Sequence, residues 1–439
     1  MKKILFASTA LVAAGVLSTG SASASDAISL SLGGYSKWWV VGAWNSSSFE
    51  QSPGNYSKNP GNSGGTTGVN QSGTANFNNA DVKGDNMVFI GGKTTLNNGM
   101  KVGVDVHIQA GGNTLPSTDT VDKSYVWLEG GFGKFLVGSQ KNGTYLLGNT
   151  APDAAGNWND GGIMTNNWAL AKPVGVNGMA GGNTTLINTT DNAAGITYVA
   201  PTFYGLTVGG SFIPNAQQNV FGHPTNMNAA QVNLSGGASS AMVTNLQPPV
   251  KSVYGVGALY ANTFGPIGFK ADAGWITAQV DNAAAQTSFA GNGGVLANGW
   301  MEQRYGVNLS YAGFTAGGSY RHQQSNNSNG GLAGLQEQTT WGDGSFANGD
   351  AYDLGLQYAT GPYAVSFSYF QSQTQSGWAG YTTDAHDHID FYQLSGKYNL
   401  GPGVDILASA GYANYNGAAN IAADHNSGWT AMSGLSLTF

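Results

Sequence analysis

The sequence predicts an all-β protein, a sixteen-stranded antiparallel transmembrane β-barrel with short periplasmic turns and long external loops. Three observations support this fold class. Apolar and polar residues alternate with a period of two over many short segments. The connections between these segments alternate between short and long. After residue 24, no segment has 18 or more consecutive apolar residues, so strands rather than helices would have to cross any membrane.

The alternation is clearest in residues 101–110, where the even positions are apolar and the odd positions are polar or glycine. A β-strand places successive side chains on opposite faces, so this segment predicts a strand with one apolar and one polar face. The same pattern recurs in residues 352–358 and 363–369. It also occupies residues 429–439, which end on Phe439.

Seven short turns and eight long connections join the sixteen predicted strands. The short turns are Asn97–Gly99, Gly130–Gly133, Pro201–Tyr204, Gly265–Pro266, Ala312–Gly313, Gly361–Pro362 and Gly401–Gly403. The long connections cover residues 45–83, 111–122, 141–191, 214–250, 283–302, 324–349, 374–388 and 417–427. An even strand number with short turns at one end is typical of bacterial outer-membrane barrels. Closure of the sheet also pairs every strand edge, which a lipid environment requires.

Aromatic residues lie near the ends of several predicted strands, on the apolar face. They are Tyr352, Tyr358, Tyr363, Tyr369 and Trp429. Such residues form girdles at the two membrane interfaces of a barrel. Ordinary β-propensity in a soluble sheet is the alternative explanation for each one taken singly.

Composition excludes several classes of function. Charged residues make up 9% of the 439 residues, the formal net charge is −7, and there is no cysteine. Thiolate metal sites, disulfides and a cysteine nucleophile are therefore excluded, and the acidic balance argues against nucleic-acid binding. No phosphate-binding loop of the GxxxxGK[ST] type and no Ser/His/Asp set can be identified. The sequence predicts no enzyme and no cofactor.

The first residues predict a secretory signal peptide. Lys2 and Lys3 form its positive start, Ile4–Leu17 its apolar segment, and Ala22–Ala24 a small-residue cleavage site. The expected domains are a signal peptide over residues 1–24 and a mature barrel over residues 25–439. Removal of the two lysines takes the formal charge from −7 to −9.

Three stretches resemble the Gram-negative general porins, in particular their alphaproteobacterial branch. The stretch 122–140, DKSYVWLEGGFGKFLVGSQ, resembles the family's strand–turn–strand signature with a Gly-Phe-Gly turn. The stretches 93–104, KTTLNNGMKVGV, and 191–212, DNAAGITYVAPTFYGLTVGGSF, are similar to the hairpins on either side. A terminal aromatic residue such as Phe439 is typical of outer-membrane barrels.

The resemblance implies a homotrimeric, water-filled channel in the outer membrane for ions and small hydrophilic solutes. It implies that the third loop, about residues 141–191, folds into the lumen and narrows it. It also implies contact with outer-membrane lipid and lipopolysaccharide, and recognition of the C-terminal strand ending in Phe439 by the outer-membrane assembly machinery. A loop of this length is unusual in a compact fold and is often functional.

Charged residues on the lumen side are the candidates for the pore, because charges at a constriction set which ions pass. The candidates on the third loop are Asp153 and Asp160. Alternation directs Arg304, Arg321, Lys270 and Asp272 to the lumen, where Lys270 and Asp272 are close enough along one face to pair. The candidates on the early strands are Lys93, Lys101, Lys123, Asp105 and His107. For each of them, simple wetting of the channel wall is the alternative role.

The net acidic charge predicts a weakly cation-selective channel. Three alternatives remain open: a substrate-specific channel, for example for sugars; a surface adhesin or structural barrel; and a secreted soluble β-protein. A cluster before the fourteenth strand, Asp384, His386, Asp387, His388 and Asp390, has metal-binding residue types. Because it lies in a predicted loop without a fixed ligand spacing, a solvated surface loop is the preferred interpretation.

Overall fold

The computed structural model describes residues 27–51, 78–111, 121–158, 170–173, 176, 184–190, 192–215, 250–280, 299–325, 348–375 and 385–439. These residues form sixteen strands. The strands are β1 (Ser29–Trp44), β2 (Ala80–Thr95), β3 (Lys101–Gln109), β4 (Val121–Gly130), β5 (Gly133–Ser139), β6 (Ala194–Val199), β7 (Leu206–Asn215), β8 (Val250–Phe264), β9 (Ile267–Val280), β10 (Gly299–Tyr311), β11 (Phe314–Ser325), β12 (Gly349–Thr360), β13 (Tyr363–Gln375), β14 (His386–Gly401), β15 (Val404–Asn416) and β16 (His425–Thr438).

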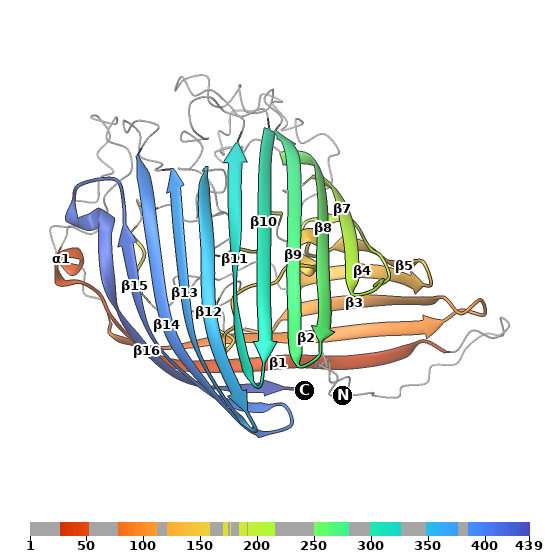
Figure 1. Ribbon diagram of the computed structural model, residues 1–439, viewed down its shortest axis with the longest axis horizontal. Helices are drawn as coiled ribbons and strands as arrows, with labels where there is room; N and C mark the ends of the chain where they lie inside the picture. Colours follow the sequence, from red (N-terminus) through yellow and green to blue (C-terminus); the bar gives the residue numbers. More distant parts are fainter. Residues whose placement is uncertain are drawn as a thin grey trace, which may run out of the picture.

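Each strand pairs antiparallel with its neighbours in the sequence, and β1 pairs with β16 to close the sheet into a barrel (Figure 1). The closing register places Tyr35 opposite Thr438 and Trp44 opposite Trp429. The predicted fold class, a closed barrel of sixteen antiparallel strands, is confirmed. Closure leaves no sheet edge with unpaired backbone groups, which is the condition for a strand-built wall in lipid.

In the part of the chain that the structure describes, three short helices accompany the strands: α1 (Ser47–Glu50), α2 (Gly143–Leu146) and the 3-10 helix η2 (Ala422–Asp424). Among the described residues, the helices are all too short or too polar to cross a membrane.

The tight hairpins fall where glycine and proline punctuate the sequence. Between β10 and β11, Ala312 and Gly313 have φ angles of 49° and 87°. Two successive positive φ angles match the primed turns that suit the right-handed twist of a hairpin. The strand ends differ from the predicted ones by up to four residues: β2 begins at Ala80, β10 at Gly299 and β14 at His386. Polar residues at these strand ends do not break the extended backbone.

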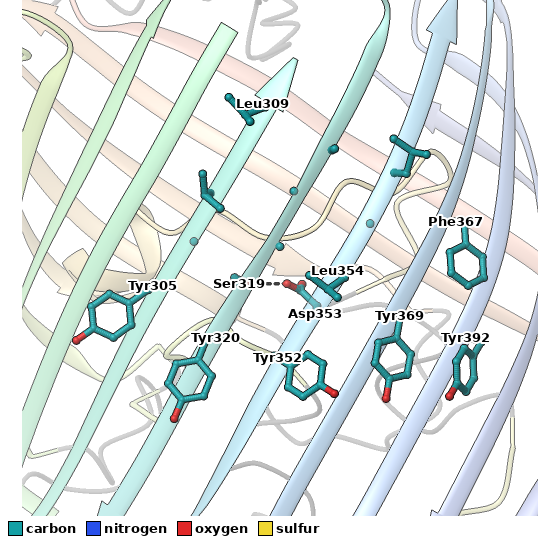
Figure 2. A pocket seen from close by; sticks show the side chains of 17 residues that line it. Tyr305, Leu309, Ser319, Tyr320, Tyr352, Asp353, Leu354, Phe367, Tyr369 and Tyr392 are labelled. Carbon is teal, nitrogen blue, oxygen red and sulfur yellow. Dashed lines mark hydrogen bonds between the residues drawn. The ribbon is translucent and has the colours of Figure 1, made fainter. Parts of the chain in front are cut away.

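The outer face of the barrel is apolar and exposed. Val307 is 45% exposed, Leu309 49% and Leu354 56%, which fits contact with lipid rather than water. Across β10–β14, five tyrosines lie in a row on this face (Figure 2): Tyr305, Tyr320, Tyr352, Tyr369 and Tyr392. They border a shallow apolar groove of about 1130 Å³, which forms because β11 presents only Ala316 and Gly318 between them. The row is the interfacial girdle expected at the long-loop end of the barrel.

The inner face contains an apolar cluster that the alternation did not predict. Phe370, Phe391 and Tyr415 point inward from β13, β14 and β15 and are almost fully buried. Their rings are in contact, with centroids 5.8 Å apart for the first pair and 5.6 Å for the second. Trp158 and Leu170, from the connection between β5 and β6, pack against the same cluster. A segment of this connection therefore lies inside the barrel.

Candidate functional site

The connection between β5 and β6, called the third loop here, begins on a capped turn of helix. The side chain of Asn142 accepts a hydrogen bond from the backbone N–H of Tyr145 (3.0 Å) and so caps α2. Its amide donates to the carbonyl of Ile187 (2.9 Å), which ties the start of the loop to its end. The N–H of Gly143 donates to Oγ of Ser211 on β7 (2.7 Å). These contacts hold α2 against the inner wall.

A buried ion pair fixes the next segment of the loop. Arg304 on β10 pairs with Asp272 on β9, and both side chains are shielded from solvent. Nη2 of Arg304 donates to the carbonyl of Asn149 (2.8 Å), while the N–H of Asn149 donates to Oδ2 of Asp272 (2.9 Å). Nε of Arg304 donates to the carbonyl of Thr185 (3.1 Å), in the returning part of the loop. One guanidinium group thus holds both the outgoing segment of the loop, at Asn149, and its returning segment, at Thr185.

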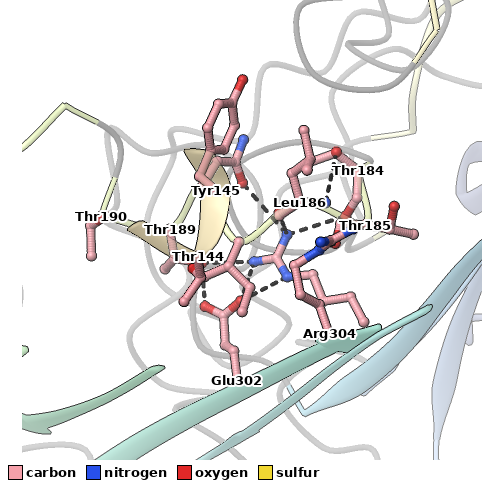
Figure 3. A network of polar contacts seen from close by, with 12 residues as sticks. Thr144, Tyr145, Thr184, Thr185, Leu186, Thr189, Thr190, Glu302 and Arg304 are labelled. Carbon is pink, nitrogen blue, oxygen red and sulfur yellow. Dashed lines mark hydrogen bonds and ion pairs between the residues drawn. The ribbon is translucent and has the colours of Figure 1, made fainter. Parts of the chain in front are cut away.

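A second buried pair lies one strand further along. Arg321 on β11 pairs with Glu302 on β10 at 2.6 Å, and both side chains are fully buried. The guanidinium also donates to Oγ1 of Thr189 (2.7 Å) and to the carbonyl of Leu186 (2.9 Å). Figure 3 shows this network, with the loop threonines gathered above Glu302 and Arg304. Buried charges are tolerated only when paired and hydrogen-bonded, and the loop supplies the remaining acceptors.

From Asn149 onward, the loop runs along the inner wall of the barrel. The N–H of Ala151 donates to Asp353 on β12 (3.1 Å), and the N–H of Ala154 to Ser366 on β13 (2.8 Å). The side chain of Asn157 donates to Ser409 on β15 (2.9 Å). The described residues 148–158 and 184–190 are therefore hydrogen-bonded to β9–β16, and the loop follows the inside of this half of the barrel.

The structure places Asp153 in this row of contacts. Its Oδ2 accepts from the N–H of Asn157 (2.9 Å), and its Oδ1 accepts from Ser366 (3.3 Å) and Gln393 (3.4 Å). The carboxylate is half-buried and holds the loop to β13 and β14. The other loop candidate, Asp160, lies outside the described residues.

The opposite half of the inner wall carries the other candidates together. Lys93 lies on β2, Lys101, Asp105 and His107 on β3, and Lys123 on β4, all on the inward faces of adjacent strands. The cross-strand register sets His107 opposite Lys123. None of these side chains is fully buried. Alternation and strand order together determine this placement of the five side chains.

Other charged residues of this wall were not among the candidates. Strands β1–β5 hold six lysines and five carboxylates: Lys37, Lys83, Lys93, Lys101, Lys123, Lys134, Asp81, Asp85, Asp105, Asp122 and Glu129. Several are loosely paired: Lys123 and Asp122 are 3.6 Å apart, and Lys134 and Glu129 3.9 Å apart. The alternation that selected Lys93 and Asp105 also selects Lys37, Asp85, Glu129 and Lys134, whereas Asp81, Lys83 and Asp122 lie in segments that the sequence predicted as connections. Partly exposed pairs of this kind stabilise little.

Two expectations need correction. Arg304 and Arg321 face inward as predicted, but the third loop covers them, so their charges do not line open water. Lys270 and Asp272 share a face, yet Asp272 pairs with Arg304 across the strands. The guanidinium reaches Asp272 from the neighbouring strand and is fixed by the loop carbonyls, whereas Lys270 remains exposed.

The His/Asp cluster also differs from its prediction as a loop. Four of its members lie in β14: His386, Asp387, His388 and Asp390. Asp387 faces the inside of the barrel, and the other three are on the outward face of the strand. Asp384 lies outside the described residues. In the part of the chain that the structure describes, no three His, Cys, Asp or Glu side chains are grouped to hold a metal ion.

The closed barrel, its apolar outer face and its loop-lined interior define a class of protein, the channel-forming barrels of the bacterial outer membrane. The family model described as Gram-negative porin matches residues 7–418, and the chain belongs to this family. Its place is therefore the outer membrane. No curated protein sequence matches the chain significantly.

Solved structures share the fold at low sequence identity. The trimer form of OmpT, an outer membrane protein of Vibrio cholerae, aligns with a TM-score of 0.52 and 12% identity over 94% of this chain and 100% of its own. The anion-selective porin from Comamonas acidovorans aligns with a TM-score of 0.51 and 13% identity, over 94% and 100%. The outer membrane channel DcaP of Acinetobacter baumannii gives 0.52 and 11%, over 94% and 97%.

Proposed function

We propose that this porin is a passive diffusion channel for ions and small hydrophilic solutes. The observation that carries the proposal is the division of the inner wall into two halves. Residues 148–158 of the third loop are hydrogen-bonded to β9–β16, whereas β1–β5 present partly exposed charged side chains to the lumen. A route between the loop and this wall is polar on the wall side, as an aqueous channel requires. The proposal assigns the chain no chemical reaction and no cofactor.

Weak cation selectivity is part of the proposal. The formal charge of −7, or −9 after loss of the first two lysines, favours cations by electrostatic focusing. The near balance of lysines and carboxylates on β1–β5 opposes a strong preference. Asp153, Lys93, Lys101, Asp105, His107, Lys123 and Lys270 are the residues proposed to act on passing ions. Arg304, Arg321 and Asp272 are proposed to act indirectly, by fixing the loop.

The proposed assembly is a homotrimer in contact with outer-membrane lipid and lipopolysaccharide. Supporting it, the hydroxyl of Ser36 donates to the side chain of Asn86 on the outward face of β1 and β2, between lipid-facing positions. Asn86 also donates to the carbonyl of Gly111 (2.9 Å). A polar pair at this depth favours a protein neighbour over lipid. The V. cholerae outer membrane protein OmpT, which shares the fold, is described in a trimer form.

Export is proposed to use residues 1–24 as a cleaved signal peptide, and these lie outside the described residues. The mature chain, residues 25–439, would then reach the assembly machinery with its last strand free. Once the barrel has closed, the backbone N–H of Phe439 donates to the carbonyl of Gly34, which helps to join β16 to β1.

Liposome swelling tests passive diffusion directly. Liposomes that contain the purified protein should swell in glycerol, glucose and a disaccharide at rates that fall in that order of size. Heat-denatured protein is the control. Folded protein that produces no swelling in any of the three solutes would contradict the proposal.

A further inference from the structure

An aromatic row crosses the inner face of β1–β4, outside the strands β9–β16 to which loop residues 148–158 are hydrogen-bonded. Tyr35 contacts Phe89, with ring centroids 5.9 Å apart. Phe89 lies 4.4 Å from the His107 ring, and His107 lies 6.4 Å from Tyr125. With strands about 4.8 Å apart, the row extends roughly 15 Å around the wall.

The row is not part of the hydrophobic core inside the barrel. The inward rings of Phe370 and Phe391 are fully buried and packed against Trp158 of the third loop. By contrast, Tyr35, Phe89, His107 and Tyr125 all keep part of their surface exposed. The hydrogen bonds of loop residues 148–158 fall on β9–β16, away from this row. A contiguous row of partly exposed rings is a common feature of ligand-binding grooves.

Hydrogen-bonding groups of both kinds flank the rings. Asp85 accepts a hydrogen bond from the hydroxyl of Tyr35 (3.1 Å). Asp105 accepts from Nε1 of Trp127 (2.7 Å), which extends the row on β4. Nζ of Lys37 lies 5.0 Å from the centre of the Tyr35 ring, and Lys123 stands opposite His107. Carboxylate acceptors and ammonium donors thus alternate beside the rings.

This combination fits a neutral sugar. A sugar hydroxyl both donates and accepts, so it is satisfied by a carboxylate and an ammonium side by side. The face of a sugar ring presents C–H groups that pack on aromatic rings, and such apolar faces with a few placed polar groups are typical of small-molecule sites. A charged solute would be favoured by an excess of one sign, whereas β1–β4 carry five lysines and five carboxylates.

We propose that the inner wall of β1–β4 is a weak binding site for carbohydrates, centred on Phe89, His107 and Tyr125, along which sugars pass through the lumen. This inference rests on the proposed channel function. It adds a saturable step for one class of solute to a pore that otherwise admits small solutes by size.

The test is single-channel recording in planar bilayers, with maltotriose added to one side. Sugar bound to the wall should interrupt the current in a saturable, concentration-dependent manner. Phe89→Leu and Tyr125→Leu remove the aromatic face but keep an apolar side chain. Each variant should raise the half-blocking concentration at least about fivefold, whereas the control Phe367→Leu, on the outer face of β13, should leave it unchanged.

The outcomes separate this inference from the proposed function. Open channels that maltotriose does not interrupt would overturn the sugar site and leave the diffusion channel intact. Block that persists unchanged in both aromatic variants would overturn its location. Interruption by benzoate and not by maltotriose would assign the row to aromatic anions instead. A folded barrel with no conductance at all would instead contradict the channel on which the inference rests.

Discussion

Arg304 on β10 and Asp272 on β9 form an ion pair whose side chains are 0% and 1% exposed, sealed beneath the third loop. Asn149 of the loop bonds both partners, donating to the carboxylate and accepting from the guanidinium. The pair therefore connects two strands of the wall to the segment that crosses the lumen. Its disruption should affect both the barrel and the loop.

Neutralising one partner should be strongly destabilising. Asp272→Asn leaves a buried guanidinium without its counter-ion, which costs about 3–5 kcal/mol. The double variant Asp272→Asn with Arg304→Met should recover part of this loss, because no charge then stays buried unpaired. Denaturant unfolding followed by circular dichroism measures both. The control is Lys270→Gln, an exposed residue on the same face of β9, expected to change stability by less than about 0.5 kcal/mol. Equal effects of Asp272→Asn and Lys270→Gln would contradict the assignment.

Two tryptophans on opposite faces should respond differently to truncation. Trp158 lies 5% exposed against the inner apolar cluster, whereas Trp429 on β16 is 64% exposed on the outer face. Trp158→Ala should cost about 3–5 kcal/mol and release the loop, seen as larger and noisier current. Trp429→Ala removes little packing and should leave the current level unchanged. A silent Trp158→Ala variant would show that the loop is held without the cluster.

A cross-link should confirm the path of the loop. The N–H of Ala154 reaches Oγ of Ser366 at 2.8 Å, and the chain contains no cysteine that would compete. Ala154→Cys combined with Ser366→Cys should therefore form a disulfide on oxidation and leave the conductance at the wild-type level. The matched control, Ala154→Cys with Lys93→Cys on the opposite wall, should remain reduced. A disulfide in the control pair and none in the test pair would place residue 154 next to β2 rather than β13, which would contradict the path of the loop.

The charged side chains on the inner wall of β1–β5 should tune the ion preference of the channel. Lys93→Gln removes a positive charge from the lumen and should raise the permeability ratio of K⁺ to Cl⁻ by about 1.5–2-fold at low salt. Asp105→Asn should lower the ratio by a similar factor, which makes the two variants mutual controls. Reversal potentials in a KCl gradient measure the effect. Shifts of the same sign in both variants would exclude a role for wall charge.

The strand order and the two faces of the barrel were predictable from the sequence because alternation is a local property. Lys101, Asp105 and His107 were placed on the inner wall for this reason, and the structure brings them together. The predicted strand ends were less accurate. His386 and His388 were predicted in a loop but lie in β14, because a strand can continue past its apolar segment into polar residues.

The interior contacts of the loop were not predictable in the same way. Arg304 meets Asn149 and Thr185, each more than 100 positions away, and no period in the sequence records such contacts. One local signal was present: aromatic neighbours such as Tyr369–Phe370 and Phe391–Tyr392 break the alternation. At these places one ring faces lipid and the other packs inside, so consecutive apolar residues in an otherwise alternating strand mark inner packing.

The central claim is that the barrel encloses an open channel between the third loop and the β1–β5 wall. Single-channel recording of the folded, detergent-purified protein in a planar bilayer with a KCl gradient tests it most directly. The account predicts discrete conductance steps, grouped in threes for a trimer, with a reversal potential on the cation side. A folded barrel that gives no steps would contradict the open channel and favour a closed, structural or adhesive barrel.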